Sequence, residues 1–246
     1  MHRDRIVVIT GAAGGIGTVL VDRFLANQDT VVAVDINGTS LASLVQTRDA
    51  GSRLVPLRAD LSQESDCERL ARSAGEVAGR VDVLVHCAGY FPICRFEDMS
   101  AQDWRSVIDI NLTATFFLTR AILPLMKGRG WGRIINYTSS SIYDGVPGRA
   151  HYAAAKAGVV GFSRTIAREL GSYGITVNMI SPGLTLTPPV LKHFSPQMLE
   201  NQLTRRAIQR DQVPADLVGA TFFLASPESE FMSGQTINVD GGRTML

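Results

Sequence analysis

The sequence has few cysteines, and their arrangement excludes two common kinds of structural site. Only Cys67, Cys87 and Cys94 occur in 246 residues, and no two of them form a Cys-x-x-Cys pair. An odd number of scattered thiols indicates neither a disulfide framework nor a zinc site. We therefore expect no bound metal, and we predict a cytoplasmic protein.

An excess of charge of one sign and long apolar runs are also absent. The chain has 24 Lys and Arg against 23 Asp and Glu, which gives a formal net charge of +1. This balance does not favour nucleic acid or an anionic membrane as a partner. No segment reaches the ~18 consecutive apolar residues of a membrane span, and the early apolar run Ile6–Ile9 is too short for a signal peptide. We expect neither a nucleic-acid nor a membrane partner.

What the sequence does contain is a regular alternation of short apolar, β-branched runs with longer helical stretches. Apolar strands that alternate with helices predict a parallel sheet covered on both faces, in a doubly wound Rossmann α/β fold. A length of 246 residues fits one such domain, 1–246, with seven strands. The expected strands are Ile6–Thr10, Val31–Val34, Leu54–Leu57, Val81–His86, Arg133–Tyr137, Thr176–Ile180 and Thr236–Val239. The expected helices are Ile16–Asn27, Leu41–Thr47, Glu64–Val77, Ala101–Lys127, Ala150–Leu170 and Pro214–Ala225.

One stretch, from Pro182 to about Val213, breaks this rhythm. It contains no predicted strand, and Pro188, Pro189 and Pro196 are expected to interrupt any helix. Irregular segments of this length in compact domains are usually functional. We predict a substrate lid at about 184–212.

The first predicted strand ends in the glycine-rich turn Thr10–Gly17, which opens directly into a helix. Glycines let the backbone approach a pyrophosphate, and the unpaired N–H groups of a helix N-terminus favour anions. The second strand ends in Asp35, about 20 residues after Gly15, where dinucleotide sites place a carboxylate near the adenosine ribose. Such a carboxylate repels a 2′-phosphate, and no Lys or Arg lies within the turn or just after Asp35. We therefore predict NAD as the cofactor.

A tyrosine and a lysine four residues apart, Tyr152 and Lys156, share one face of a predicted helix. A free tyrosine has a pKa of about 10. An adjacent ammonium is expected to lower the pKa of Tyr152, so that its hydroxyl exchanges protons near neutrality. Ser139 follows the fifth predicted strand, and its hydroxyl is expected to hold a substrate oxygen beside Tyr152. This set predicts the interconversion of an alcohol and a carbonyl.

With these motifs the chain resembles the short-chain dehydrogenase/reductase family from Ile6 to about Gly242. The glycine turn and the residues Ser139, Tyr152 and Lys156 match the motifs of that family. The resemblance implies that Asn111 completes the catalytic set by holding the water that links Lys156 to solvent. It also implies a cofactor-binding set formed by Gly11, Gly15, Ile16, Gly17, Asp35, Ile36, Asp60, Leu61, Cys87, Ala88, Gly89, Tyr152, Lys156, Pro182, Gly183, Thr185 and Thr187.

The chain departs from the family pattern after the fourth strand, where the usual Asn-Asn-Ala-Gly is His86-Cys87-Ala88-Gly89. Ala88 and Gly89 keep the close approach to the cofactor, whereas the two lost amide side chains remove supporting hydrogen bonds. We interpret His86 as a packed residue at the end of a strand rather than as a ligand.

The side chains expected at the mouth of the cleft are mainly apolar or aromatic, and we predict a small-molecule secondary alcohol or ketone as the substrate. They are Tyr90–Ile93, Ser141–Tyr143, Val190, Leu191, Phe194, Met198 and Leu199. A 3-oxoacyl-carrier-protein reductase of fatty-acid synthesis is one alternative, although Asp35 and the lack of a large basic patch disfavour it. A non-enzymatic NAD-sensing regulator is another, and it has no need of the four catalytic residues. The resemblance and the long apolar helix 101–127 also predict a homotetramer.

Overall fold

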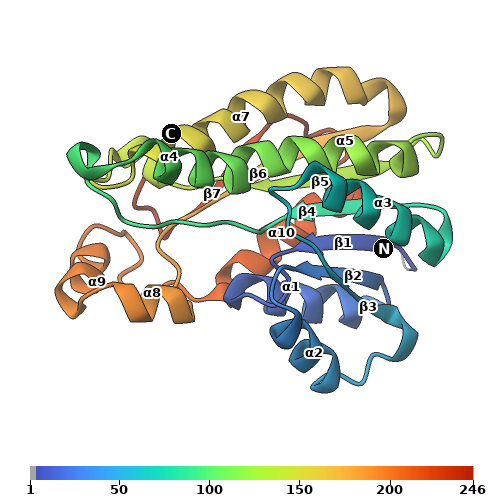
Figure 1. Cartoon of the computed structure of the whole chain (residues 1–246), viewed down its shortest axis with the longest axis horizontal. Helices are drawn as coiled ribbons and strands as arrows, with labels where there is room; N and C mark the ends of the chain where they lie inside the picture. Colours follow the sequence, from blue (N-terminus) through green and yellow to red (C-terminus); the bar gives the residue numbers. More distant parts are fainter. Residues whose placement is uncertain (1–3, 246) are drawn as a thin grey trace.

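Seven parallel strands form one sheet in the computed structural model, which describes residues 4–245 (Figure 1). The strands lie in the order β3-β2-β1-β4-β5-β6-β7, so the direction of strand addition reverses between β1 and β4. The predicted doubly wound Rossmann fold is thereby confirmed. The strands are β1 Ile6–Thr10, β2 Thr30–Asp35, β3 Leu54–Arg58, β4 Val83–His86, β5 Gly132–Tyr137, β6 Ile175–Pro182 and β7 Thr236–Val239.

Helices cover both faces of the sheet (Figure 1). One face carries α1 Gly15–Ala26, α2 Gly38–Gln46 and α10 Val218–Leu224, the last preceded by the 3-10 turn Pro214–Leu217. The other face carries α3 Glu64–Ala78, α4 Ala101–Ile108, α5 Ala114–Met126 and α7 Ala150–Leu170. The short helix α6 Ser141–Asp144 follows β5, and further 3-10 turns span Gly51–Arg53, Phe96–Asp98, Gly171–Tyr173 and Pro227–Ser229.

Alternate residues of the central strand β1 belong to the two separate cores that these layers enclose. Val7 and Ile9 pack in the core beneath α1, whereas Ile6 and Val8 pack in the core beneath α3 and α5. All four side chains are buried, because both faces of a parallel sheet are covered and successive side chains point to opposite faces. This explains why the strands read as continuous apolar runs in the sequence.

The helix predicted over Ala101–Lys127 has a wider turn inside it. Residues Asp109–Thr113 form a π-helical turn between α4 and α5. Ser100 and Asp103 form a capping box that fixes the start of α4, with reciprocal hydrogen bonds of 3.1 and 3.0 Å. By length and composition alone the stretch Ala101–Met126 could cross a membrane. Core helices of soluble proteins pass the same test, and here α5 packs against α3 while α4 packs against α7.

The predicted lid contains two short helices, α8 Pro188–His193 and α9 Pro196–Leu203. The expectation that the prolines interrupt helices here was therefore wrong. Pro188 and Pro196 stand at the first position of their helices, where the missing N–H group costs nothing. The lid also has a strand-like contact, because an isolated parallel bridge joins Thr185 to Gln212 at its two ends.

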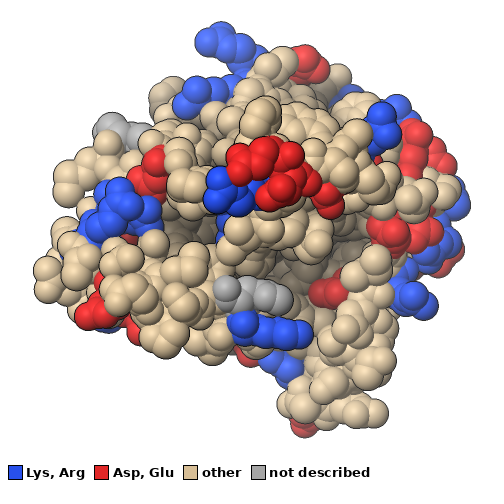
Figure 2. All heavy atoms as spheres, turned by 60° about the vertical axis from the view of Figure 1, so that its left-hand side comes forward, with Lys and Arg blue, Asp and Glu red and all other residues tan. Residues whose placement is uncertain are grey.

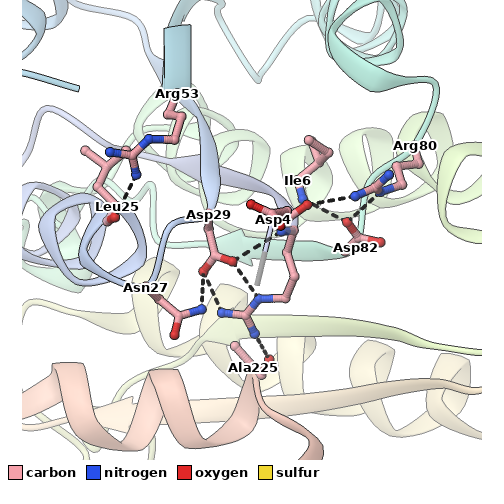
Figure 3. A network of polar contacts seen from close by, with 10 residues as sticks. Asp4, Ile6, Leu25, Asn27, Asp29, Arg53, Arg80, Asp82 and Ala225 are labelled. Carbon is pink, nitrogen blue, oxygen red and sulfur yellow. Dashed lines mark hydrogen bonds and ion pairs between the residues drawn. The ribbon is translucent and has the colours of Figure 1, made fainter. Parts of the chain in front are cut away.

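A buried polar network closes the edge of the sheet at which the strands begin (Figure 3). The guanidinium of Arg5 holds the carboxylate of Asp29 through Nε at 2.9 Å and Nη2 at 2.6 Å. Its Nη1 donates to the carbonyl of Ala225, next to α10. Asp82 accepts hydrogen bonds from the Ile6 amide at 2.8 Å and from Arg80 Nε at 3.0 Å. Because Arg5 and Asp29 are both buried and paired, removing one of these two charges is expected to cost about 3–5 kcal/mol.

Candidate active site

The residues predicted for the site gather at the opposite edge of the sheet, where the strands end. In an open α/β sheet, ligands bind outside the carboxyl ends of the strands, at the point where the strand order reverses. Here a cleft of about 250 Å³ opens between the ends of β4, β5 and β6 and the lid. Figure 2 shows the surface hollowed on this side of the molecule.

The glycine turn brings the start of α1 into the cleft. Gly11 has a φ of +66°, and a Cβ there would lie 2.9 Å from the Cα of Ala88. A Cβ on Gly17 would lie 2.0 Å from the carbonyl oxygen of Gly11, so only glycine fits. Helix α1 has Gly14 as its N-cap, no side-chain cap and no acidic residue in its first turn. Its first N–H groups are therefore available to an anion such as a pyrophosphate.

The donors and acceptors around this turn fit a dinucleotide. Asp35 stands at the end of β2, and its carboxylate accepts hydrogen bonds from the amides of Ala13 at 3.1 Å and Asn37 at 3.0 Å. It is thus held between the glycine turn and the start of α2. Ile36 beside it is 57% exposed and free to cover a ligand.

Sequence reasoning missed an arginine near Asp35. Arg58 is the register partner of Asp35 on the neighbouring strand β3, and its Nε donates to the carbonyl of Ile36 at 3.1 Å. The two residues are far apart in the sequence, so only the pairing of β2 with β3 could have revealed their proximity.

Further residues of the predicted cofactor-binding set follow β3 and β4. Asp60 comes after β3 and binds the amide and hydroxyl of Ser62, while Leu61 is buried beside it. After β4, the amides of Cys87 and Ala88 both donate to the Thr10 hydroxyl at 3.1 Å. These bonds fix the chain ends of β1 and β4 against each other.

The structure brings Ser139, Tyr152 and Lys156 to the wall of the cleft. Ser139 follows β5, and its Oγ lies 2.9 Å from Ser141 Oγ. Tyr152 and Lys156 come from successive turns of α7, with Lys156 Nζ 5.8 Å from the centre of the Tyr152 ring. The expected depression of the tyrosine pKa is not found in the protein without cofactor. Burial raises the pKa of Tyr152, although its interaction with Ser139 and the charge of Arg149 oppose this effect.

Lys156 is itself buried, and burial lowers its pKa to about 8. Its Nζ donates to the carbonyl of Tyr137 at 2.8 Å, which ties α7 to the end of β5. Asn111 lies close by on the π-helical turn, because a Cβ on Gly89 would lie 3.1 Å from Asn111 Oδ1 and 3.7 Å from Lys156 Nζ. Asn111 Nδ2 donates to the carbonyls of Tyr90 at 2.7 Å and Val107 at 3.0 Å. All four predicted catalytic residues therefore meet at one place.

Comparison with known proteins identifies the family of the chain. A family model described as enoyl-(acyl carrier protein) reductase matches residues 11–244. The chain is 35% identical over 250 residues to a 3-oxoacyl-(acyl-carrier-protein) reductase of Synechocystis sp., with 98% of each chain covered. It is 36% identical over 245 residues to an acetoacetyl-CoA reductase of Allochromatium vinosum, covering 98% of this chain and 99% of that one. The crystal structure of a short-chain dehydrogenase/reductase, glucose/ribitol dehydrogenase, from Brucella melitensis superposes with a TM-score of 0.93 at 32% identity, covering 99% of this chain and 98% of that one.

The chain belongs to the short-chain dehydrogenase/reductase family. It is thus an oxidoreductase that acts on CH–OH or carbonyl groups with a nicotinamide cofactor, and not a regulator without catalytic activity. The glycine turn, Asp35 and the cleft beside Lys156 are the parts of this short-chain dehydrogenase/reductase whose chemistry fits that cofactor.

This short-chain dehydrogenase/reductase departs from the usual family sequence at His86 and Cys87, and the two side chains lie in different surroundings. His86 Nε2 lies 3.0 Å from the hydroxyl of Thr119 on α5, and burial lowers the pKa of His86 to about 3. It is a packed, neutral residue at the end of β4, as predicted. Cys87 lines the cleft, and burial raises the pKa of its thiol to about 12, so the thiol is unreactive at neutral pH.

The end of β6 and the start of the lid of this short-chain dehydrogenase/reductase contribute four of the predicted cofactor-binding residues. Pro182, Gly183, Thr185 and Thr187 all line the cleft. A Cβ on Gly15 would lie 2.8 Å from Thr187 Cγ2, so the lid touches the glycine turn directly. Val190, Phe194 and Met198 also face the cleft, as the sequence predicted.

Sequence reasoning did not predict three charged residues that line the same cleft, namely Asp144, Arg149 and Arg243. Asp144 and Arg243 form an ion pair of 2.9 Å between α6 and the segment after β7. Arg149 immediately precedes α7. No sequence pattern marks these residues, because each is brought to the cleft by a different element of the fold.

Proposed function

We propose that this short-chain dehydrogenase/reductase interconverts a secondary alcohol and a ketone with NAD(H), using Tyr152 as the general acid and base. The observation that supports this proposal is the meeting of Ser139, Tyr152, Lys156 and Asn111 beside one mainly apolar cleft. Apolar and aromatic side chains such as Phe91, Val146 and Val190 line much of its wall.

Each catalytic residue has a separate task in this proposal. The bound nicotinamide accepts or supplies the hydride. Tyr152 exchanges a proton with the substrate oxygen through its hydroxyl, and Ser139 holds the same oxygen. The ammonium of Lys156 favours the phenolate form of Tyr152. Asn111 bonds the backbone of Tyr90 and so positions the loop after β4 against the lysine.

Asp35 supports NAD as the cofactor of this enzyme. Its carboxylate lies between the glycine turn and α2, where it would accept hydrogen bonds from the ribose hydroxyls of a bound dinucleotide and would repel a 2′-phosphate. Arg58 on β3 is a nearby group that would favour a 2′-phosphate, but its Nε already donates to the carbonyl of Ile36. We propose that the carboxylate dominates the choice.

An initial-rate screen tests the proposed activity. The enzyme is assayed with NAD and NADP on secondary alcohols that include 1-phenylethanol, and with NADH and NADPH on the matching ketones. We expect turnover with a preference for NAD(H), abolished in Tyr152→Phe. Normal activity of Tyr152→Phe would contradict the proposed mechanism.

A second candidate is supported by the relatives named above, one a 3-oxoacyl-(acyl-carrier-protein) reductase and the other an acetoacetyl-CoA reductase. In that case the substrate is a 3-oxoacyl thioester. Including acetoacetyl-CoA with NADH and NADPH in the same screen separates the two candidates, because the thioester would then be reduced faster than every simple ketone.

We further propose that the enzyme is a cytoplasmic homotetramer. Its three cysteines are free thiols, as a reducing compartment favours. Trp104 on α4 and Phe116 on α5 are each 41% exposed on adjoining helices. Burial of such aromatic side chains against a second copy of the chain would stabilise an assembly.

A further inference from the structure

A buried arginine lines the cleft beside Tyr152 without a carboxylate partner. Arg149 is only 7% exposed. Its Nη1 donates to the carbonyl of Phe91, and no ion pair joins it to an acidic group among the residues that the structure describes. Burying a charged group without a counter-charge is costly, so a fold that retains one at a cleft indicates a ligand that supplies the counter-charge.

Three aromatic rings hold the guanidinium in place. Its central carbon lies 5.5 Å from the ring centre of Phe91, 5.9 Å from that of Tyr152 and 5.5 Å from that of Phe194. The rings come from the loop after β4, from α7 and from the end of α8 in the lid. Cation–π contacts at these distances offset part of the desolvation and limit the motion of the side chain.

The edge of the guanidinium formed by Nε and Nη2 has no hydrogen-bond partner among the groups that the structure describes. That edge is a fork that binds the two oxygens of a carboxylate at once. The same protein uses it elsewhere, because Arg5 holds Asp29 through Nε and Nη2. Arg149 can thus bind a carboxylate in the cleft through the same two nitrogens that Arg5 uses within the core.

The electrostatics of the cleft favour an anion at this position. The acid that lines it, Asp144, is already paired with Arg243 at 2.9 Å. Arg149 is the N-cap of α7, whose first turn contains no acidic residue, so the helix N-terminus adds positive potential at the same point. Lys156, whose Nζ lies 5.8 Å from the centre of the Tyr152 ring, contributes a further cationic group to the cleft.

We propose that Arg149 binds the carboxylate of the substrate, and that the substrate class is therefore a hydroxy acid and its oxo acid, with the carboxylate close to the reacting carbon. This inference rests on the alcohol–ketone oxidoreduction proposed above. The guanidinium lies 5.9 Å from the Tyr152 ring, so proton exchange and anion binding occur side by side. A thioester or a simple ketone leaves Arg149 unpaired, and both are poorer substrates for this reason.

The test compares hydroxy acids with their own methyl esters. Lactate, 3-hydroxybutyrate and 4-hydroxypentanoate, each with its ester, are assayed at saturating NAD with wild type, Arg149→Gln and Arg72→Gln. Arg72 is an exposed arginine of α3 and serves as the matched control. For one chain length we expect kcat/KM for the acid to exceed that for the ester by at least about 30-fold, the effect of removing one partner from a desolvated charge pair. In Arg149→Gln activity on the ester also falls, because the charge of Arg149 lowers the pKa of Tyr152. Activity on the acid falls much further, so the ratio drops to about 1, whereas Arg72→Gln keeps the wild-type ratio.

Two outcomes overturn the inference while the proposed function stands. One is equal turnover of acids and esters by wild type. The other is an equal loss of activity on acid and ester in Arg149→Gln, which would mean that Arg149 only anchors the loop at Phe91. Failure of every alcohol to react overturns the proposed function instead. The role of Arg149 is then tested without turnover by calorimetric titration of 3-hydroxybutyrate into NAD-loaded Tyr152→Phe. Binding to Tyr152→Phe that disappears in Tyr152→Phe/Arg149→Gln supports carboxylate binding by Arg149. Equal binding to both variants, or no binding to Tyr152→Phe, refutes it.

Discussion

Replacing Lys156 by methionine is expected to inactivate the enzyme and yet to stabilise its fold at neutral pH. Burial lowers the pKa of Lys156 from 10.5 to about 8. A difference of this size means that the folded protein holds the charged form at a cost of about 3 kcal/mol. Methionine removes that charge but also removes the hydrogen bond from Nζ to the Tyr137 carbonyl, worth about 1 kcal/mol. The net expectation is a gain of about 2 kcal/mol in the free energy of unfolding at pH 7.

The stability difference between Lys156→Met and the wild-type protein is expected to depend on pH. Below pH 8 the lysine is protonated in both the folded and the unfolded state, so the wild-type protein bears the full cost. Between pH 8 and pH 10.5 the folded protein releases the proton while the unfolded chain keeps it, and wild-type stability rises relative to that of the variant. The difference between the two proteins therefore shrinks as the pH increases through this range.

Urea unfolding of the cofactor-free proteins at several values between pH 6.5 and 9.5 measures both effects. Lys192→Met, at an exposed position in the lid, is the control and should leave the unfolding midpoint nearly unchanged. Activity of Lys156→Met should fall by about 10²–10⁴-fold, the usual contribution of assisted proton transfer. A variant less stable than wild type at pH 7, or a stability difference independent of pH, would refute the reasoning.

Three further predictions concern cofactor choice, the lid and assembly. In Asp35→Ala, the ratio of kcat/KM with NAD to kcat/KM with NADP should fall at least tenfold, about 1.4 kcal/mol. The double variant Asp35→Ala/Arg58→Gln should recover less activity with NADP than Asp35→Ala. An unchanged ratio would exclude Asp35 as the determinant of cofactor choice. In hydrogen exchange, the amides of residues 184–210 should exchange quickly without ligand and slowly with NADH, since Leu191 and Met198 are 59% and 42% exposed. Strong protection in both states would show that this segment is rigid and does not act as a lid. Sedimentation equilibrium at micromolar concentration should give about four times the chain mass, and a 26.6 kDa species would contradict the proposed tetramer.

Much of the fold was predictable because each local pattern has a direct physical cause. The β-branched runs became strands within about two residues of their predicted bounds, and the glycine turn formed as its spacing required. The break at Asp109–Thr113 was not predictable, because the π-helical turn contains no proline or glycine that would mark an interruption of the helix. The short helices that begin at Pro188 and Pro196 were not predictable from the prolines alone, because proline interrupts the interior of a helix but is favoured in its first turn.

In the site, the residues that carry a motif were found and those that depend on tertiary packing were not. Ser139, Tyr152 and Lys156 have a fixed spacing along β5 and α7, which any member of the fold brings together. Arg58 and Arg149 have no such signature. Their roles arise from the pairing of β2 with β3 and from rings donated by three separate elements.

The order of the strands also determines how the sheet can assemble while the chain is being synthesised. Each strand from β2 to β7 pairs with a strand already made and still open on one side, first on one flank of β1 and then on the other. No strand has to enter between two paired neighbours, so the sheet can grow outwards from β1 as the chain leaves the ribosome. The wall of the cleft is completed later than the sheet, because it includes Arg243, which follows the last strand and pairs with Asp144. A nascent chain can thus hold an almost finished sheet while its substrate pocket still lacks one side.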